Sequence, residues 1–184
     1  MKMLTRNNFL RKIEVHFRLV ILKQTDRESL ILKTVAKGRG ADIGCGSRKI
    51  SPNCIGVDLT PKGKKGNFGC EKNKISVADF SSSGDNLYMF CDEELDFIVA
   101  KHNLEHYEKP EQTLCEWKRV LKKGGVVGVV VPDDKYVDSL KLDSTHRINF
   151  NLDNIEKLFE KLGFKIIKKG IALKHWSIYL IAEK

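Results

Sequence analysis

The chain has 184 residues, of which 41% are hydrophobic, so it can form one sizeable core but is short for two domains. We expect a single domain over residues 1–184, with an ordered core over 25–184 and an N-terminal segment, 1–24, whose conformation the pattern leaves open. No apolar stretch approaches the ~20 residues that span a bilayer, and basic residues interrupt the N-terminal segment, so we expect no membrane span, no signal peptide and a cytoplasmic protein. The net charge of +9 comes mostly from dispersed lysines, which favours a solvated surface over a nucleic-acid track.

The first predicted elements are helices. Residues Phe9–Leu22 fit both the alternation of a strand and one face of a helix, and we favour the helix. Thr25 followed three residues later by Glu28 is a capping-box pattern, and Gly38 can take the left-handed conformation that often follows a helix end. This second helix should lead into the first strand.

The middle of the chain alternates apolar runs with polar segments. Each run is short and is flanked by Gly, Pro, Asp or Lys, as buried strands of a parallel sheet are. The predicted strands are Ala41–Ile43, Cys54–Val57, Ile75–Ala78, Phe97–Ala100 and Val126–Val131. Between the last two, a helix should begin at Pro110, carry Leu114, Trp117, Val120 and Leu121 on one face, and end at Gly124–Gly125.

The C-terminal part predicts one more helix and a hairpin. Asp153–Leu162 has the pattern of a capped helix with Gly163 after it, and Lys165–Ile171 and Trp176–Ala182 are strand-like. Strands that alternate with helices predict an α/β fold. We therefore expect a Rossmann-like, doubly wound and mostly parallel sheet with a C-terminal antiparallel hairpin.

Polar and glycine residues follow three of the predicted strands. Gly44-Cys45-Gly46 comes directly after the first strand, Asp58 follows the second, and Asp79-Phe80 follows the third. Glycine lets backbone amides approach a ligand closely, and a carboxylate at a strand end can accept hydrogen bonds from both hydroxyls of a ribose. These strand ends should converge on one nucleoside, with Asp79 near the adenine amino group.

A dinucleotide site is the alternative for such a glycine turn. It requires a third glycine, but Lys49 stands in that position, and Asp58 is closer than the ~20 residues usual for that fingerprint. The pattern therefore disfavours NAD.

These residues resemble the class I S-adenosylmethionine-dependent methyltransferases, in particular the small methyltransferase-domain group called type 11. The resemblance runs from about Gly40 to the C-terminus and includes Leu95–Val99, the loop His102–His106 and the segment Trp117–Gly125. It implies S-adenosylmethionine as the cofactor. The cofactor-binding residues it implies are Asp42, Gly44, Cys45, Gly46, Asp58, Leu59, Asp79, Phe80, Lys101 and Asn103.

The chain departs from this family in its first crossover. Only the eleven residues Ser47–Val57 separate the glycine turn from Asp58, where the family usually fits a helix. We expect an abbreviated crossover and a more open cofactor pocket. The same short spacing occurs in a subset of the family that is associated with sugar or cell-envelope biosynthesis.

Methyl transfer from a sulfonium chiefly requires the acceptor and the methyl carbon to be held in line, and a general base helps a hydroxyl or protonated amine. We predict His106 as the first choice for this base and His102 as the second; packing or orienting the cofactor is the alternative role for this loop. The acceptor should be selected by the region Pro132–Phe150 and be an oxygen or nitrogen atom of a small molecule. Its polar candidates are Asp133, Asp134, Tyr136, His146 and Arg147.

Two other functions remain open. The charge of +9 would suit an RNA methyltransferase, although no aromatic residues are interleaved with the lysines, and the fold could also serve as a non-catalytic partner module. The five cysteines are odd in number and include no C-x-x-C pair, so we expect reduced thiols and no metal site.

Overall fold

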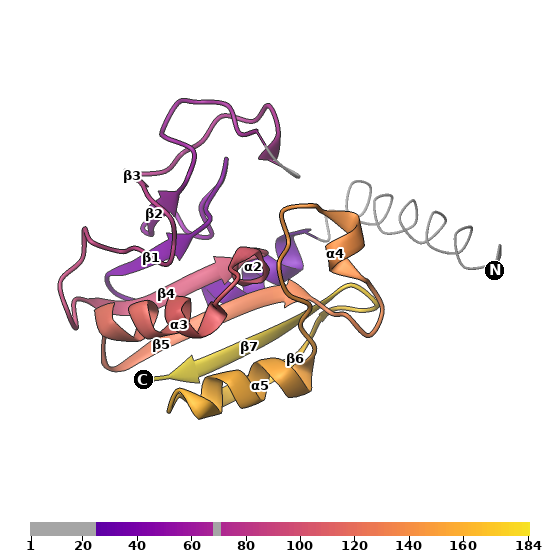
Figure 1. Cartoon of the computed structure of the whole chain (residues 1–184). Helices are drawn as coiled ribbons and strands as arrows, with labels where there is room; N and C mark the ends of the chain where they lie inside the picture. The colour runs from indigo at the N-terminus through magenta and orange to yellow at the C-terminus, as the bar shows by residue number, and fades with distance from the viewer. Residues whose placement is uncertain (1–24, 68–70) are drawn as a thin grey trace.

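The computed structural model describes residues 25–67 and 71–184, and in them the chain forms one seven-stranded sheet of order β3-β2-β1-β4-β5-β7-β6 (Figure 1). Strands β1 to β5 run parallel, while β7 is antiparallel to both β5 and β6. The strands are β1 Gly40–Ile43, β2 Ile55–Asp58, β3 Phe80–Ser81, β4 Leu95–Lys101, β5 Leu121–Pro132, β6 Lys165–Leu173 and β7 Ser177–Glu183. This confirms the predicted mostly parallel sheet with a C-terminal antiparallel hairpin.

Short helices connect these strands: α2 Thr25–Lys33, the 3-10 turn η2 Leu104–His106, α3 Pro110–Val120, α4 Ser139–Leu142 and α5 Leu152–Lys161. The predicted helix at Thr25 is present, and α5 begins with a capping box between Asn151 and Asn154. The predicted segment Phe9–Leu22 lies outside the described residues. Among the described helices, none is long and apolar enough to cross a membrane.

Helices pack on both faces of the sheet. Trp117 of α3 and Phe159 of α5 belong to one buried cluster with Val129 of β5, whereas Leu32 of α2 packs on the opposite face with Val130. Successive side chains of β5 thus enter different clusters, and both are fully buried. Burial of both faces explains why this strand is continuously apolar in sequence.

The predicted third strand is displaced. Ile75–Ala78 is not a strand of the sheet, and β3 is the two-residue Phe80–Ser81. The backbone of the earlier segment is bonded elsewhere, since the Ser76 amide donates to Lys64 and the Val77 amide donates to Gly46, both at 2.9 Å. Ile75 is 49% exposed, so its apolar side chain did not mark a buried strand.

The helix predicted to end at Gly124–Gly125 ends earlier, at Val120. Leu121 already pairs with Leu95 of β4 and begins β5. Gly124 has a φ of +75° and therefore supports an irregularity inside the strand, before the regular pairing resumes at Val126.

The first crossover is abbreviated, as predicted. Residues 44–54, between β1 and β2, contain turns and no helix. The half of the sheet formed by β3, β2 and β1 therefore has less helical cover than the half formed by β4, β5 and β7, as Figure 1 shows.

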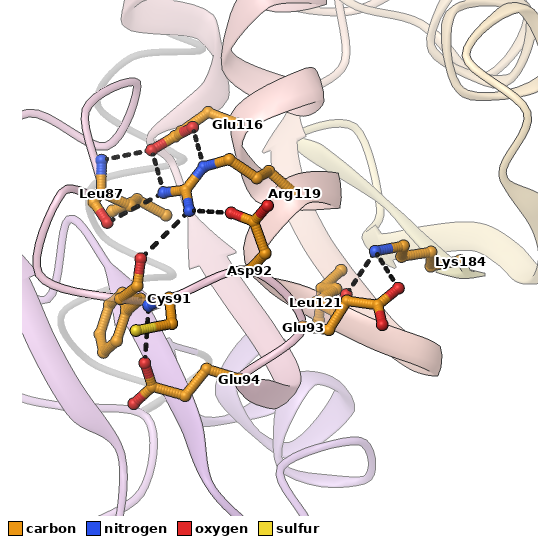
Figure 2. Close-up of polar contacts among 10 residues, drawn as sticks. Leu87, Cys91, Asp92, Glu93, Glu94, Glu116, Arg119, Leu121 and Lys184 are labelled. Carbon is orange, nitrogen blue, oxygen red and sulfur yellow. Dashed lines mark hydrogen bonds and ion pairs between the residues drawn. The ribbon is translucent and has the colours of Figure 1, made fainter.

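Arg119 at the end of α3 joins this helix to the loop that precedes β4. Its guanidinium donates to both carboxylate oxygens of Glu116, to Asp92 at 2.7 Å, and to the carbonyls of Leu87 and Phe90. Figure 2 shows this group beside the contact of Lys184 with the Leu121 carbonyl. Its hydrogen bonds to Glu116 and Asp92 raise the pKa of Arg119 further, so it stays a cation.

Candidate functional site

The turn after β1 adopts a conformation that only glycine accommodates without strain. Gly44 and Gly46 have φ angles of +73° and +53°. A Cβ atom on Gly44 would lie 2.4 Å from the Asn103 side chain, and one on Gly46 would lie 2.7 Å from the Glu71 carboxyl group. Both glycines are therefore required for the turn to fit between its neighbours.

Asp58 fastens this turn to the end of β2. Its Oδ2 accepts the Gly46 amide at 2.9 Å, and its Oδ1 accepts the Thr60 amide at 2.8 Å. A carboxylate oxygen has two lone pairs, so each oxygen of Asp58 can still accept one more hydrogen bond. The short spacing between the glycine turn and Asp58 in the sequence thus reflects a direct contact between the two.

Asp42 lies beneath the turn and is 2% exposed. Its Oδ2 accepts the Ile50 amide at 2.5 Å. Burial raises the pKa of Asp42 to about 7, against the opposing effect of the Ile50 hydrogen bond and of Lys101 and Lys49. This carboxyl group can therefore gain or lose a proton near neutral pH.

A cavity of about 1730 Å³ opens at the carboxyl ends of the parallel strands. Gly44, Asp58, Lys101 and Pro132 line it from the ends of β1, β2, β4 and β5, which is where open α/β sheets bind ligands. The predicted site residues that line it are Asp42, Gly44, Cys45, Asp58, Leu59, Lys101, His102, Asn103 and His106; Gly46, Asp79 and Phe80 do not.

The structure does not support an adenine contact for Asp79. Its carboxylate pairs with Lys49 and accepts the Gly56 amide at 2.8 Å. Burial raises the pKa of Asp79, but these contacts outweigh burial and lower the pKa overall. Phe80 instead packs edge-on against Phe90, with 6.1 Å between ring centroids. The acid that does line the cavity here is Glu71, which accepts the Ser47 amide at 2.8 Å and which no sequence pattern indicated.

His102 is held between two carboxylates. Its Nε2 lies 3.1 Å from Glu28 Oε1, and its Nδ1 lies 3.6 Å from Glu105 Oε1. Burial opposes protonation of this ring, but Glu28 and Glu105 outweigh it and raise the pKa of His102 to about 10. A ring with both nitrogens facing carboxylates offers no lone pair to a substrate, which argues against the prediction of His102 as a base.

Next to His102, three side chains gather in the cavity wall: Glu105, His106 and His146, called here the Glu105 cluster. One ligand-type atom from each lies within 4.8 Å of the other two. The two imidazole rings meet edge to face, with 4.6 Å between centroids, and His146 Nε2 is 4.0 Å from Glu105 Oε1. Burial lowers the pKa of His146, although Glu105 acts in the opposite direction.

Glu105 is fully buried, and within residues 25–67 and 71–184 neither of its carboxylate oxygens has a hydrogen-bond partner. Its main chain, in contrast, is well bonded, because its carbonyl accepts the amides of Arg147 at 2.8 Å and Ile148 at 3.3 Å. These bonds join η2 to the loop that carries His146.

Outer contacts fix both rings of the cluster. Nδ1 of His146 is 3.1 Å from the Ser139 carbonyl, and Nδ1 of His106 is 3.1 Å from the Thr145 hydroxyl. That hydroxyl donates to Asp143 at 2.6 Å, so it must accept from His106. Both rings therefore carry their proton on Nδ1, which leaves the lone pair on Nε2.

The region predicted to select the acceptor forms one wall of the cavity. Tyr136, His146 and Arg147 line it, whereas Asp133 and Asp134 do not. Asp133 is buried and accepts the Lys135 amide at 3.2 Å, so its role is to hold the local turn.

Sequence comparison assigns the family. The model of the family described as "Methyltransferase domain" matches residues 41–129. A curated relative, an uncharacterized protein of Methanocaldococcus jannaschii, is 31% identical over 159 residues, which cover 80% of this chain and 74% of that protein.

Solved structures support the same fold. A Thermotoga maritima protein described as a SAM-dependent methyltransferase, possible histamine N-methyltransferase, has a TM-score of 0.66 at 21% identity, with 96% of this chain and 97% of that one covered. The [4+2]-cyclase SpnF has a TM-score of 0.63 at 16% identity, with 86% and 81% covered, so the fold alone does not fix the reaction. Together with the glycine turn and the matched sequence, these findings show that the chain belongs to the methyltransferase-domain family of class I, S-adenosylmethionine-dependent enzymes.

Proposed function

We propose that this protein transfers a methyl group from S-adenosylmethionine to an oxygen or nitrogen atom of a small molecule. The observation that carries the proposal is the glycine turn after β1, fastened by Asp58 at the wall of the cavity. The cavity, at about 1730 Å³, exceeds the ~300–1,000 Å³ typical of single-ligand sites, which leaves room for a cofactor and an acceptor together.

The cofactor is a cation with a nucleoside, and the cavity offers matching groups. Gly44 permits close approach of the backbone, and each oxygen of Asp58 has a lone pair for a ribose hydroxyl. Asp42 and Glu71 add carboxyl groups that favour the sulfonium and ammonium charges. Lys101 and Asn103 line the same cavity, so the Lys101 ammonium is available to pair with the carboxylate of the cofactor's methionine part.

In the proposed reaction the acceptor atom forms a bond to the methyl carbon while the carbon–sulfur bond breaks, and S-adenosylhomocysteine leaves as a neutral sulfide. A hydroxyl or ammonium acceptor must also lose a proton. His106 is the side chain we propose for that role, because its proton sits on Nδ1 toward Thr145 and its Nε2 keeps a lone pair.

The cofactor assignment is tested by calorimetric titration with S-adenosylmethionine. Asp58→Ala should weaken binding by roughly 1.5–3 kcal/mol, the range for hydrogen bonds to a charged group. Asp153→Ala, an exposed aspartate of α5 that does not line the cavity, is the matched control and should bind like the wild type. An unchanged affinity in Asp58→Ala would contradict the assignment.

The acceptor is sought by following S-adenosylhomocysteine formation with sugars, amines, phenols and short RNAs, sugar and cell-envelope precursors first. With the acceptor found, His106→Ala should lower kcat by ~10²–10⁴ and leave cofactor affinity nearly unchanged. Normal turnover in this variant would remove His106 from the mechanism. Turnover on RNA alone would replace the small-molecule proposal by the RNA methyltransferase alternative.

A further inference from the structure

The carboxylate of Glu105 is fully buried, and neither of its oxygens has a hydrogen-bond partner among the described residues. The nearest cationic group is the His102 ring, whose Nδ1 is 3.6 Å from Glu105 Oε1 and which also pairs with Glu28, while His146 Nε2 is 4.0 Å away. A cation shared with a second carboxylate, without a hydrogen bond, leaves the lone pairs of Glu105 open to a further cation. The side chain lies at the edge of the cavity, so such a cation has a path to it.

We propose that Glu105, His106 and His146 bind one divalent transition-metal ion. Two imidazoles and one carboxylate are a common ligand set for zinc and for Fe²⁺, and they leave further coordination positions open. Ligand atoms bind such ions at about 2.0–2.2 Å. The three ligand atoms already lie within 4.8 Å of one another, so small rotations of the side chains suffice to bring them around one ion.

The surroundings of the two rings match this role. A histidine that binds a metal usually donates its other ring N–H to a carbonyl or carboxylate, which fixes the ring and its protonation. His146 does so to the Ser139 carbonyl, and His106 does so to Thr145, which itself donates to Asp143. In both rings Nδ1 is thus the donor, so Nε2 is the atom left to bind a metal.

The ligand chemistry also selects the class of ion. Mg²⁺ and Ca²⁺ prefer oxygen ligands, whereas two imidazole nitrogens favour zinc, iron, nickel or copper. The cysteine pattern predicted no metal, and it could not have indicated this one, because the ligands are two histidines and a glutamate that the fold brings together.

The ion would also define the acceptor, a step that rests on the proposed function. An open coordination position facing the cavity suits a hydroxyl oxygen, whose proton then passes to solvent more readily. That oxygen would form the new carbon–oxygen bond as the carbon–sulfur bond breaks. With the ion bound, His106 acts as a ligand and no longer as a free base, so turnover should depend on the metal.

The test uses the full-length, untagged protein, freed of metal by a chelator and titrated with Co²⁺. We expect one equivalent to bind with visible d–d absorption and to raise the melting temperature, and Zn²⁺ to displace it. Glu105→Gln and His146→Ala should each weaken Co²⁺ binding at least ~10–100-fold, as even outer-shell changes do. The matched control is His175→Ala, since His175 lines the same cavity but is not in the cluster.

Glu105→Gln keeps the test independent of folding. Without metal it should melt close to the wild type, because Gln has the shape of Glu and Glu28 still pairs with His102, yet metal should no longer raise its melting temperature. Absence of one-equivalent binding in the wild type, or unchanged binding in His146→Ala, would overturn the proposal. A parallel titration with S-adenosylmethionine separates the two proposals: cofactor binding without Co²⁺ binding removes only the metal site, and the reverse removes only the proposed function.

Discussion

The protonation state of Asp42 should affect both the stability of the protein and its affinity for the cofactor. Its pKa in the folded protein is about 7 and its ordinary value is 3.8, so between these values the folded state binds more protons than the unfolded state. The contribution of Asp42 to the free energy of unfolding should therefore fall as pH rises from about 4 to about 7, and stay constant above that.

The same group should make cofactor binding pH-dependent. An ionised Asp42 attracts the cationic cofactor, so affinity for S-adenosylmethionine should increase from pH 6 to about pH 7.5 and binding at pH 6.5 should release a proton. Lys49, Lys101 and Asp58 are the other charged groups acting on Asp42. Calorimetry in two buffers of different ionisation enthalpy measures the release. Asp42→Asn, which keeps the acceptor for the Ile50 amide, should bind with little dependence on pH; an equal dependence in both proteins would show that another group titrates.

At the scale of elements, α3 and the loop before β4 should be coupled through Arg119. Arg119→Lys keeps the charge but cannot form the planar fork that reaches Glu116, Leu87 and Phe90 together. We expect a loss of about 1–3 kcal/mol in the free energy of unfolding, mainly from the bonds to the less exposed Glu116 and to the carbonyls. Lys122→Ala removes only an exposed pair with Asp96 and should cost less than Arg119→Lys. Urea denaturation of the two variants compares them, and equal losses would mean that charge alone matters at Arg119.

Local patterns predicted the elements that have a local cause. Pro110, the glycine turn and the continuous apolar run in β5 act within a few residues, and each was assigned from sequence correctly. The misplaced third strand has a different origin, because Ile75 is apolar but exposed and its neighbours bond to a loop.

The contacts that sequence could not give are those between distant segments. Glu28 fits a capping pattern, yet its side chain pairs with His102 and accepts the hydroxyl of Ser177, residues that only the sheet brings near it. The Glu105 cluster likewise joins η2 to a loop beyond β5.

Over the whole molecule, stability should decrease from the centre of the sheet towards β3. Val99, Val129 and Leu180 of β4, β5 and β7 are fully buried, whereas both residues of β3 are exposed and no helix covers residues 44–54. Hydrogen exchange should therefore be slowest in the three central strands. S-adenosylmethionine at 100 times its Kd stabilises the bound state by ~2.7 kcal/mol, and amides of residues 44–60 should then exchange about 100-fold more slowly. Protection confined to β7 would place the ligand elsewhere.

In Glu105 the backbone supports the structure of the site, whereas the side chain is available for binding. The carbonyl of this residue holds the neighbouring loop, and any amino acid supplies the same carbonyl, while the side chain makes no hydrogen bond to that loop. Replacement of the side chain should leave the loop in position and change only what the cavity binds. With such an arrangement, a mutation at this position can change specificity while the protein still folds. This is one physical route by which a single scaffold can acquire different acceptors, or even different reactions.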